Sequence, residues 1–331
     1  MKRLNHIFSL MCIAAVAAVV VACGNPKDKA FTNTTTSGIA SIYCDCSFEN
    51  IMNQEIEVFE FTYPDANIVP YYVDERTAID SLLALKTSII VTEQRLDDEQ
   101  VKYMKGNMVR NVRQQRLAVD AIALIVNNEN QIEELAMQDI RDIFSGKVKR
   151  WGEIEPTNLK NDSIVVVFDR VGSSITHHIR DSIAGGKPFL SNVYAQGSSE
   201  DVFKVVEKKK NAIGFIGVSW VTTDMKSKDV PLEEKVKELN EQSTTTLDFT
   251  SKTKVLSVRY DDQIKGKKPY QAYIFDGSYP LFRSIYGTTI GAGGSLTSGF
   301  YSYLTGFVGQ KIIQNTGVLP AAIQPRFVEL E

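Results

Sequence analysis

The sequence has few of the residues from which catalytic and metal sites are usually built. Only three histidines and four cysteines occur in 331 residues. His177 and His178 are adjacent, but no nucleophile with a neighbouring base and no carboxylates at metal-ligand spacing accompany them. This scarcity argues against a hydrolase acting on phosphorylated substrates. We expect no catalytic residue, no metal and no cofactor.

The cysteines also give little support for a disulfide scaffold. Cys12 lies in the apolar N-terminal stretch, so only Cys44 and Cys46 remain in the body of the chain besides Cys23. A two-residue offset on a strand puts both side chains on one face, and a bridge between them would close a strained small ring. We therefore expect Cys44 and Cys46 to be buried, inert thiols.

No excess of positive charge is present. Lys and Arg number 37 and Asp and Glu number 40, for a net charge of −3. Such a balance argues against a general nucleic-acid binder and against the attraction of anions by net charge. Any anion must therefore be captured by local geometry.

Only one long apolar stretch occurs, at residues 7–22, after the basic start Met1-Lys-Arg. It is shorter than the roughly 20 residues of a membrane-spanning helix, and it predicts a signal peptide over residues 1–22. The small residues before Cys23 make it resemble a bacterial lipoprotein signal. This resemblance implies a lipid on Cys23, a tether over 23–37 and a cell-envelope location facing the periplasm. An ordinary cleaved signal and an anchor helix are the alternatives.

The body alternates strand-like and helix-like segments, which is typical of an α/β protein with largely parallel sheets. The segment 222–254 is charged and rich in Thr and Ser, which predicts an exposed excursion. Strands are expected at 39–44, 67–73, 88–92, 121–126, 211–220 and 270–275, and helices at 48–59, 78–85, 137–146 and 300–315.

One motif predicts an anion site. The string FDRVGSSIT at 168–176 follows an apolar strand and begins an amphipathic segment. A helix start presents unpaired backbone N–H groups, and here Arg170 and several hydroxyls join them. Ser174 and Thr176 could also serve as helix caps. The glycines at 291–294 lack the lysine and spacing of a P-loop and indicate a loop.

Five strings, in order, resemble signature segments of phosphate-binding proteins from ABC importers. They are MQDIRDIFSGKVKRWG at 137–152, DRVGSSIT at 169–176, AIGFIGVSW at 212–220, YPLFRSIYG at 279–287 and SGFYSYLTGFVGQKIIQNTGVLPA at 298–321. The resemblance implies a two-lobed α/β periplasmic-binding-protein fold of the type II Venus-flytrap kind, with the ligand in a cleft between lobes. Lobe I would comprise 38–124 plus 265–331, and lobe II 125–264.

The same resemblance implies a ligand set when it is carried over residue by residue. Ser47 would supply a hydroxyl and Phe48 a backbone N–H from the turn after the first strand. Arg170 would supply the charge. Ser174 and Thr176 would supply hydroxyls from the opposing lobe.

The sequence departs from the family pattern in two ways. Ile175 stands where the family usually has glycine, so the backbone there approaches a ligand less closely. Thr92 and Glu93 stand where it often has a Ser-Asp pair. An acidic acceptor can take a hydrogen bond from the protonated oxygen of hydrogen phosphate, which ionised sulfate lacks. Glu93 could do so, or it could point elsewhere with Arg95 as partner.

The expected function is therefore that of a monomeric, lipid-tethered substrate-binding protein. It would capture inorganic phosphate, or a similar oxyanion, and deliver it to an ABC permease without chemical conversion. Binding of another oxyanion, or an oxyanion-responsive sensor or adaptor on the cell surface, is the alternative.

Overall fold

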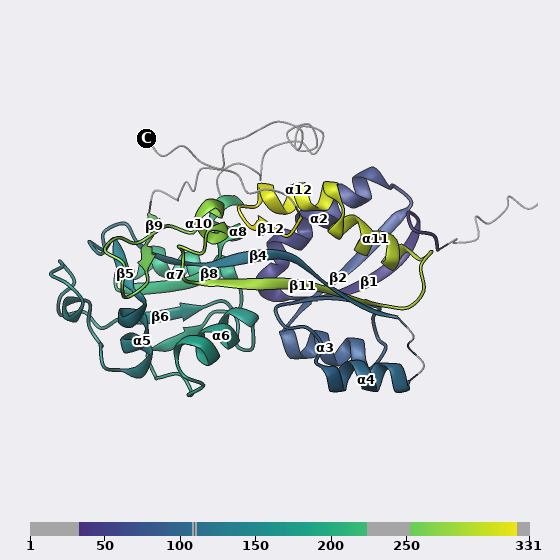
Figure 1. Ribbon diagram of the computed structural model, residues 1–331. Helices are drawn as coiled ribbons and strands as arrows, with labels where there is room; N and C mark the ends of the chain where they lie inside the picture. Colours follow the sequence, from purple (N-terminus) through teal and green to yellow (C-terminus); the bar gives the residue numbers. More distant parts are fainter. Residues whose placement is uncertain (1–32, 108, 110, 224–251, 323–331) are drawn as a thin grey trace, which may run out of the picture.

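A computed structural model describes residues 33–107, 109, 111–223 and 252–322 of the chain. The predicted signal peptide, Cys23 and most of the predicted excursion at 222–254 lie outside this part. The described chain forms two α/β lobes side by side (Figure 1). None of its helices combines the length and the apolar character needed to cross a membrane.

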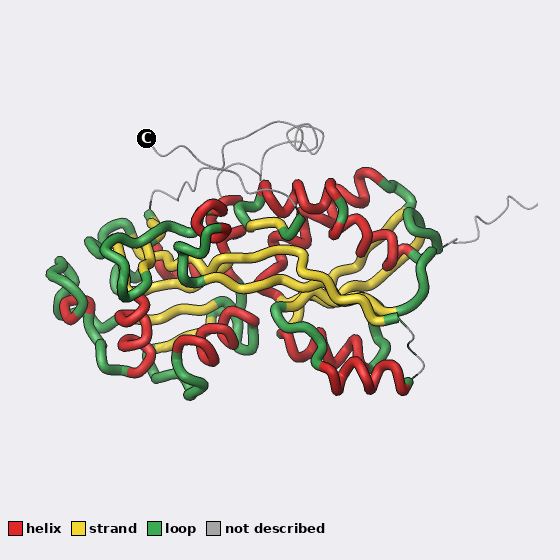
Figure 2. Tube along the Cα trace, in the orientation of Figure 1, coloured by secondary structure: helices red, strands yellow, loops and turns green. Residues whose placement is uncertain are grey.

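One mixed sheet runs through both lobes (Figure 2). Short strands β9 (Thr253–Val255) and β12 (Leu319–Pro320) also pair with β4, and β5 (Glu134–Ala136) pairs with β10 (Ser257–Arg259). The main strands in spatial order are β2 (Ala66–Val73), β1 (Gly38–Asp45), β3 (Ile89–Thr92), β11 (Phe282–Ile290), β4 (Val112–Asn127), β8 (Ala212–Gly217), β6 (Val165–Phe168) and β7 (Val193–Ala195).

Strand β4 connects the two lobes. Up to Ala121 it pairs with antiparallel β11, and from Ile122 to Val126 it pairs with β8. The strand expected at 121–126 is thus the second half of a longer strand. Its residues from Ala121 to Val126 are fully buried, as the unbroken apolar run AIALIV predicts for a strand covered on both faces.

Helices cover both faces of the sheet, which confirms the α/β prediction (Figure 1). In the first lobe α2 (Glu49–Thr62), α11 (Leu296–Thr305) and α12 (Phe307–Asn315) lie on one face, and α3 (Glu75–Leu83) and α4 (Asp98–Gly106) on the other. The second lobe contains α5 (Met137–Ser145), α6 (Ser174–His178) continued by the π-helical turn η3 (Ile179–Ile183), α7 (Ser199–Lys208), α8 (Val218–Thr223) and the 3₁₀ turn η2 (Trp151–Glu153). Helix α10 (Gln271–Phe275) packs against β4 and β12.

Local predictions were mostly confirmed. Gly146 ends α5 in the left-handed conformation, with φ 74°, as a glycine C-cap requires. The expected strand at 270–275 is wrong, because this segment forms α10. Buried Gln271 donates from Nε2 to two backbone carbonyls near the chain's C-terminal end, at 2.6 and 3.1 Å, and this tertiary anchor overrides the strand-like composition.

The strand expected at 211–220 ends at Gly217, where α8 begins. Gly214 and Gly217 of this strand leave space for neighbouring side chains, and not for the close approach of another backbone. A Cβ on Gly214 would lie 2.6 Å from Val202 Cγ1, and a Cβ on Gly217 would lie 3.1 Å from Asp120 Oδ2.

Residues 33–37, at the end of the predicted tether, lie against the first lobe. The backbone N–H of Leu296, at the start of α11, donates to Asn33 Oδ1 at 2.8 Å. A Cβ on Gly299 would lie 1.9 Å from the carbonyl oxygen of Thr35, so the glycine permits this close approach. The body of the protein therefore begins to make contacts before β1.

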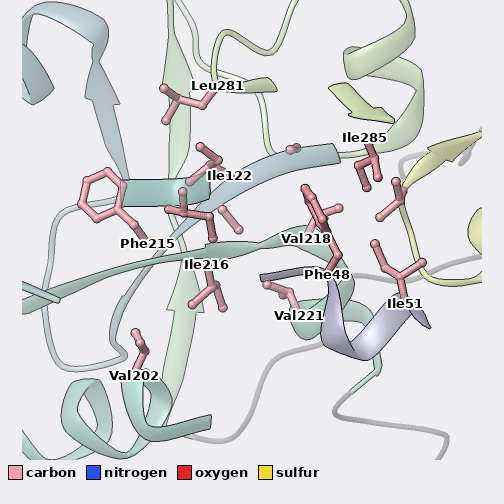
Figure 3. Close-up of a cluster of buried hydrophobic side chains, with 14 of the residues drawn as sticks. Phe48, Ile51, Ile122, Val202, Phe215, Ile216, Val218, Val221, Leu281 and Ile285 are labelled. Carbon is pink, nitrogen blue, oxygen red and sulfur yellow. The ribbon is translucent and has the colours of Figure 1, made fainter. Parts of the chain in front are cut away.

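The apolar core is continuous between the lobes. Phe48 and Ile51 at the start of α2 belong to the same buried cluster as Val218 and Val221 of α8, with Ile122 of β4 among them (Figure 3). Because α2 belongs to one lobe and α8 to the other, apolar contacts join the two lobes around the crossing strand.

Glu55 is the one charged-type side chain on the core face of α2. It is fully buried, and neither carboxyl oxygen has a hydrogen-bond partner. It faces a small void lined by apolar residues of α2 and of strands β3, β4 and β11, with one residue each from α11 and α12. Burial raises the pKa of this carboxyl well above its usual value, so folding favours the protonated form.

We expect Glu55→Met to stabilise the fold by about 1–3 kcal/mol at pH 8, the usual cost of an unsatisfied buried polar group. The raised folded-state pKa means that wild-type stability is full below the unfolded pKa and is lost as pH rises through the folded pKa. The gain should therefore be smaller at pH 4 in urea unfolding. Exposed Glu57→Gln on the same helix is the control, and an equal gain at both pH values would contradict the prediction.

Candidate functional site

The candidate site lies where strands of the two lobes end, parallel strands β1 and β3 in the first lobe and β6, parallel to β8, in the second. Asp45 is the last residue of β1, Glu93 follows β3, and Asp169 follows β6. In open α/β sheets ligands bind at the carboxyl ends of the strands. β1 and β3 belong to the first lobe and β6 to the second, so residues of both lobes meet here.

A buried arginine occupies the centre of the site. Arg283, near the start of β11, is 2% exposed. Its Nε and Nη2 donate to Asp120 Oδ2 on the neighbouring strand β4, at 3.1 and 2.9 Å. Burial acts to lower the pKa of Arg283, but the Asp120, Glu93 and Asp45 carboxylates outweigh it and raise the pKa. The guanidinium therefore stays charged.

The predicted hydroxyls of Ser47 and Ser174 are brought together from opposite lobes. Their oxygens lie 2.7 Å apart, and both side chains are buried. Arg283 Nη1 donates to Ser174 Oγ at 2.5 Å and to Ser47 Oγ at 3.2 Å. The two serines and the arginine thus form one contact set across the lobe interface.

The Asp45 carboxylate accepts hydrogen bonds from the same serines. Its Oδ1 accepts from Ser47 N at 3.0 Å, from Ser47 Oγ and from Ser174 Oγ at 2.7 Å. Its Oδ2 accepts from Ser174 N at 3.0 Å. Burial raises the pKa of Asp45 to about 6, against the opposing effects of Ser47, Arg283 and Ser174. The donors therefore surround a group with two anionic oxygens.

Arg170, the predicted source of charge, lies beside this set rather than within it. Its Nε donates to Gly197 O at 3.1 Å, and its Nη1 donates across the interface to Tyr72 O at 3.4 Å. The preceding Asp169 is buried and accepts from Arg170 N and Ser173 Oγ through Oδ1, while its Oδ2 has no partner. Burial raises the pKa of Asp169.

The remaining predicted residues have other contacts. Thr92 Oγ1 donates to Gln94 O at 2.6 Å, and Thr176 Oγ1 donates to Ser173 O at 2.8 Å, so both hydroxyls are used by nearby backbone. Ser173, rather than Ser174 or Thr176, caps α6.

The Phe48 ring lies under the guanidinium of Arg283, with 4.5 Å between Cζ and the ring centroid. Ile175 is fully buried in the core, on a helix whose first turn faces the site. Both side chains are therefore part of the packing around the site, and only the backbone N–H groups of these two residues could contact a ligand.

Glu93 lies between the arginine and His178. Its Oε1 lies 2.6 Å from His178 Nδ1, and its buried Oε2 has no hydrogen-bond partner and lies 3.7 Å from Arg283 Nη1. His177 Nδ1 lies 3.8 Å from Oε2 of Glu75, another residue of the first lobe. A pocket of about 100 Å³ between the lobes is lined by Glu75, Glu93, Gln94, His177, His178, Asp181 and Ser182.

Sequence reasoning missed three of the central residues, Arg283, Asp120 and Asp45. Arg283 stands within the family-like string YPLFRSIYG, and an arginine inside an otherwise apolar strand needs a buried acidic partner. This arginine in an apolar string was the sequence signal that could have predicted a buried ion pair. Asp120 also interrupts an apolar run, but its pairing with Arg283 depends on the neighbouring positions of β4 and β11.

The chemistry of the described site is that of hydrogen bonding and charge. Cys44 and Cys46 are buried and free, as predicted. No group of three His, Cys, Asp or Glu suited to a metal ion occurs in the described ranges. The set of two hydroxyls, two backbone N–H groups and one guanidinium nitrogen suits a compact oxyanion.

We expect Glu75→Gln to lower the pKa of His177 in an NMR titration. The Glu75 carboxylate raises the pKa of His177 against the effects of burial and Arg180. The attraction between the two lobes at this pair is therefore full below the ordinary histidine pKa and is lost as pH rises through the raised value. Glu99→Gln, on exposed α4, is the control, and an unchanged His177 titration in Glu75→Gln would contradict the assignment.

Comparison with known protein families gives one match that spans most of the chain. The model described as the PBP superfamily domain matches residues 29–306. Among curated proteins, the phosphate-binding protein PstS of Bacillus subtilis is 22% identical over 334 residues, covering 97% of this chain and 95% of that protein. The protein of the same name from Pseudomonas aeruginosa PAO1 is 25% identical and covers 69% of this chain and 73% of its own length.

Solved structures show the same two-lobed fold. A phosphate ABC transporter substrate-binding protein from Clostridium perfringens, described as putative and solved with bound phosphate, matches with a TM-score of 0.64 and 20% identity. That match covers 86% of this chain and all of that one. An ABC-type phosphate transport receptor from Vibrio cholerae matches with a TM-score of 0.60 and 17% identity, covering 85% of this chain and 99% of that one.

Proposed function

The chain belongs to the family of the PBP superfamily domain, and from this membership and the site geometry we propose that it is a substrate-binding protein for inorganic phosphate. It would hold phosphate between its lobes and deliver it to an ABC-type importer, without converting it. The observation that carries the proposal is the convergence of Ser47 and Ser174, from opposite lobes, on buried Arg283. The names of the relatives agree with it.

The proposed ligand set keeps the predicted residues and adds Arg283. Ser47 Oγ, Ser174 Oγ and the N–H groups of Phe48 and Ile175 would be the neutral donors. Arg170 would stand at the edge of the ligand. Glu93, whose Oε2 has no hydrogen-bond partner, would accept a hydrogen bond from a protonated phosphate oxygen. Thr92 and Thr176 would contribute only after their hydroxyls leave the backbone carbonyls that they now contact.

We propose that the two lobes close on the ligand by rotation about the crossing strands. The predicted division assigns 38–124 plus 265–331 to lobe I and 125–264 to lobe II. The change of β4 from β11 to β8 between Ala121 and Ile122 supports a hinge slightly before the first boundary. Gly266 contacts Glu134 and Lys267 contacts Val258, both in lobe II. These contacts support placing the point where the chain crosses back into lobe I later than residue 265, near Leu281.

A lipid on Cys23 would attach the protein to the membrane and leave the lobes in the periplasm. The N-terminal sequence pattern supports this part of the proposal, and Cys23 itself lies outside the described residues. The binding function does not depend on it.

Isothermal titration calorimetry of the full-length protein in detergent, with each oxyanion in turn, measures which one the protein binds. We expect phosphate and arsenate to bind and sulfate to bind at least tenfold more weakly, because buried carboxylates accept a hydrogen bond only from a protonated oxyanion. Molybdate is the fourth ligand to compare. Absence of phosphate binding at millimolar concentration would refute the proposal, and preference for sulfate or molybdate would support the other-oxyanion alternative.

Single substitutions test the ligand set. Ser174→Ala and Arg170→Gln should each weaken phosphate binding by roughly 10- to 100-fold, because a hydrogen bond to a charged group contributes about 1.5–3 kcal/mol. Ser145→Ala and Arg141→Gln, on α5 and outside the proposed ligand set, are matched controls that should bind as wild type. Unchanged affinity in Ser174→Ala would remove the inter-lobe hydroxyl from the site.

A further inference from the structure

Asp45 occupies the place that the proposed function gives to the ligand. This residue ends β1 and is fully buried. Its Oδ1 accepts from Ser47 N, Ser47 Oγ and Ser174 Oγ, and its Oδ2 accepts from Ser174 N. Two of these four donors belong to the opposite lobe, so the carboxylate bridges the lobes in the way a bound oxyanion would.

The donors cannot serve Asp45 and a ligand at once. A serine hydroxyl carries one hydrogen and a backbone N–H carries one. The hydroxyl hydrogens of Ser47 and Ser174, both in the proposed ligand set, point to Asp45, and each would have to be released before it could bond a phosphate oxygen. Ligand binding at these donors is therefore an exchange of one anion for another.

Charge leads to the same conclusion. Arg283 is the cation that faces Asp45, and it already makes two hydrogen bonds to Asp120. Asp169, from the loop after β6, faces Asp45 with a further carboxyl. The neighbouring thiols of Cys44 and Cys46 are buried, and Glu93 approaches Arg283 from β3. An ionised Asp45 beside a phosphate would add like-charge repulsion without a cation of its own.

We propose that Asp45 is an internal occupant of the anion site. In the ligand-free protein its carboxylate holds the two lobes together through Ser174, and phosphate binds by displacing it. Asp45 thereby sets the affinity of the site. This inference rests on the proposed function for its ligand, but the lobe-bridging contact stands on the described hydrogen bonds alone.

Protonation of Asp45 should ease the exchange. Burial raises the pKa of Asp45 to about 6, so the group is largely ionised at pH 8 and largely protonated at pH 5. A protonated carboxyl competes less for N–H donors and repels the ligand less. The disadvantage that Asp45 imposes on phosphate binding should therefore be full at pH 8 and shrink as pH falls through 6.

The first test compares Asp45→Asn with wild type, as full-length proteins, by calorimetric titration with inorganic phosphate at pH 8 and pH 5. The substitution keeps the side-chain shape and the oxygen that accepts from Ser47 N but removes the charge. We expect Asp45→Asn to bind at least tenfold more tightly at pH 8 and to differ by less than about threefold at pH 5. Because both proteins are titrated with the same phosphate species at each pH, the ratio of their dissociation constants does not depend on the protonation of phosphate itself.

Asp97→Asn is the matched control, because Asp97 caps exposed α4 and asparagine is an equally good cap. It should bind phosphate as wild type at both pH values. Equal or weaker binding by Asp45→Asn at pH 8 would overturn the proposal. Weaker binding would instead assign Asp45 as an acceptor for a protonated ligand oxygen.

A second measurement needs no ligand. Small-angle scattering of phosphate-free protein at pH 8 should give a larger radius of gyration for Asp45→Ala than for wild type and Asp97→Asn. If no variant binds phosphate but Asp45→Ala opens, the proposed ligand fails and the bridging role of Asp45 is supported. If Asp45→Ala is as closed as wild type and Asp45→Asn has wild-type affinity, the internal occupant is refuted.

Discussion

The buried guanidinium of Arg283 is the interaction on which the site depends. It comes from β11, pairs with Asp120 of β4, stacks on Phe48 and reaches the serines of both lobes. A buried charge is costly unless it is paired and hydrogen-bonded, so these partners must be held in place together. The requirement ties the crossing strands, the start of α2 and the start of α6 to one another at a single point.

This constraint explains why the lobe interface is polar at its centre and apolar beside it. Phe48, Ile51, Val218 and Val221 join the cores of the two lobes around β4, while carboxylates surround the arginine a short distance away. Because the apolar contacts are non-directional and the polar contacts are directional, the former can tolerate small lobe movements that the latter cannot. The proposed ligand exchange would therefore act on the polar centre.

Much of the fold followed from local pattern. The apolar run ending at Val126, the helical spacing of α2 and the glycine after α5 each predict the element that forms, because their signals are periodicity and backbone conformation. The segment at 270–275 failed for the opposite reason. Its five-residue helix is set by Gln271 bonding to the chain near Val318, and no local pattern encodes a contact so distant in sequence.

The sequence by itself, through family resemblance, predicted the two-lobed fold, and it singled out Ser47 and Ser174 as donors from opposite lobes. Only the tertiary structure decided which arginine reaches those serines. Arg170 follows β6 and Arg283 lies in β11, and both stand in family-like strings. The pairing of β11 with β4 places Arg283 beside Asp120, and Gly217 leaves room for the Asp120 side chain. Charge position across a sheet depends on register, and register is a property of the assembled strands.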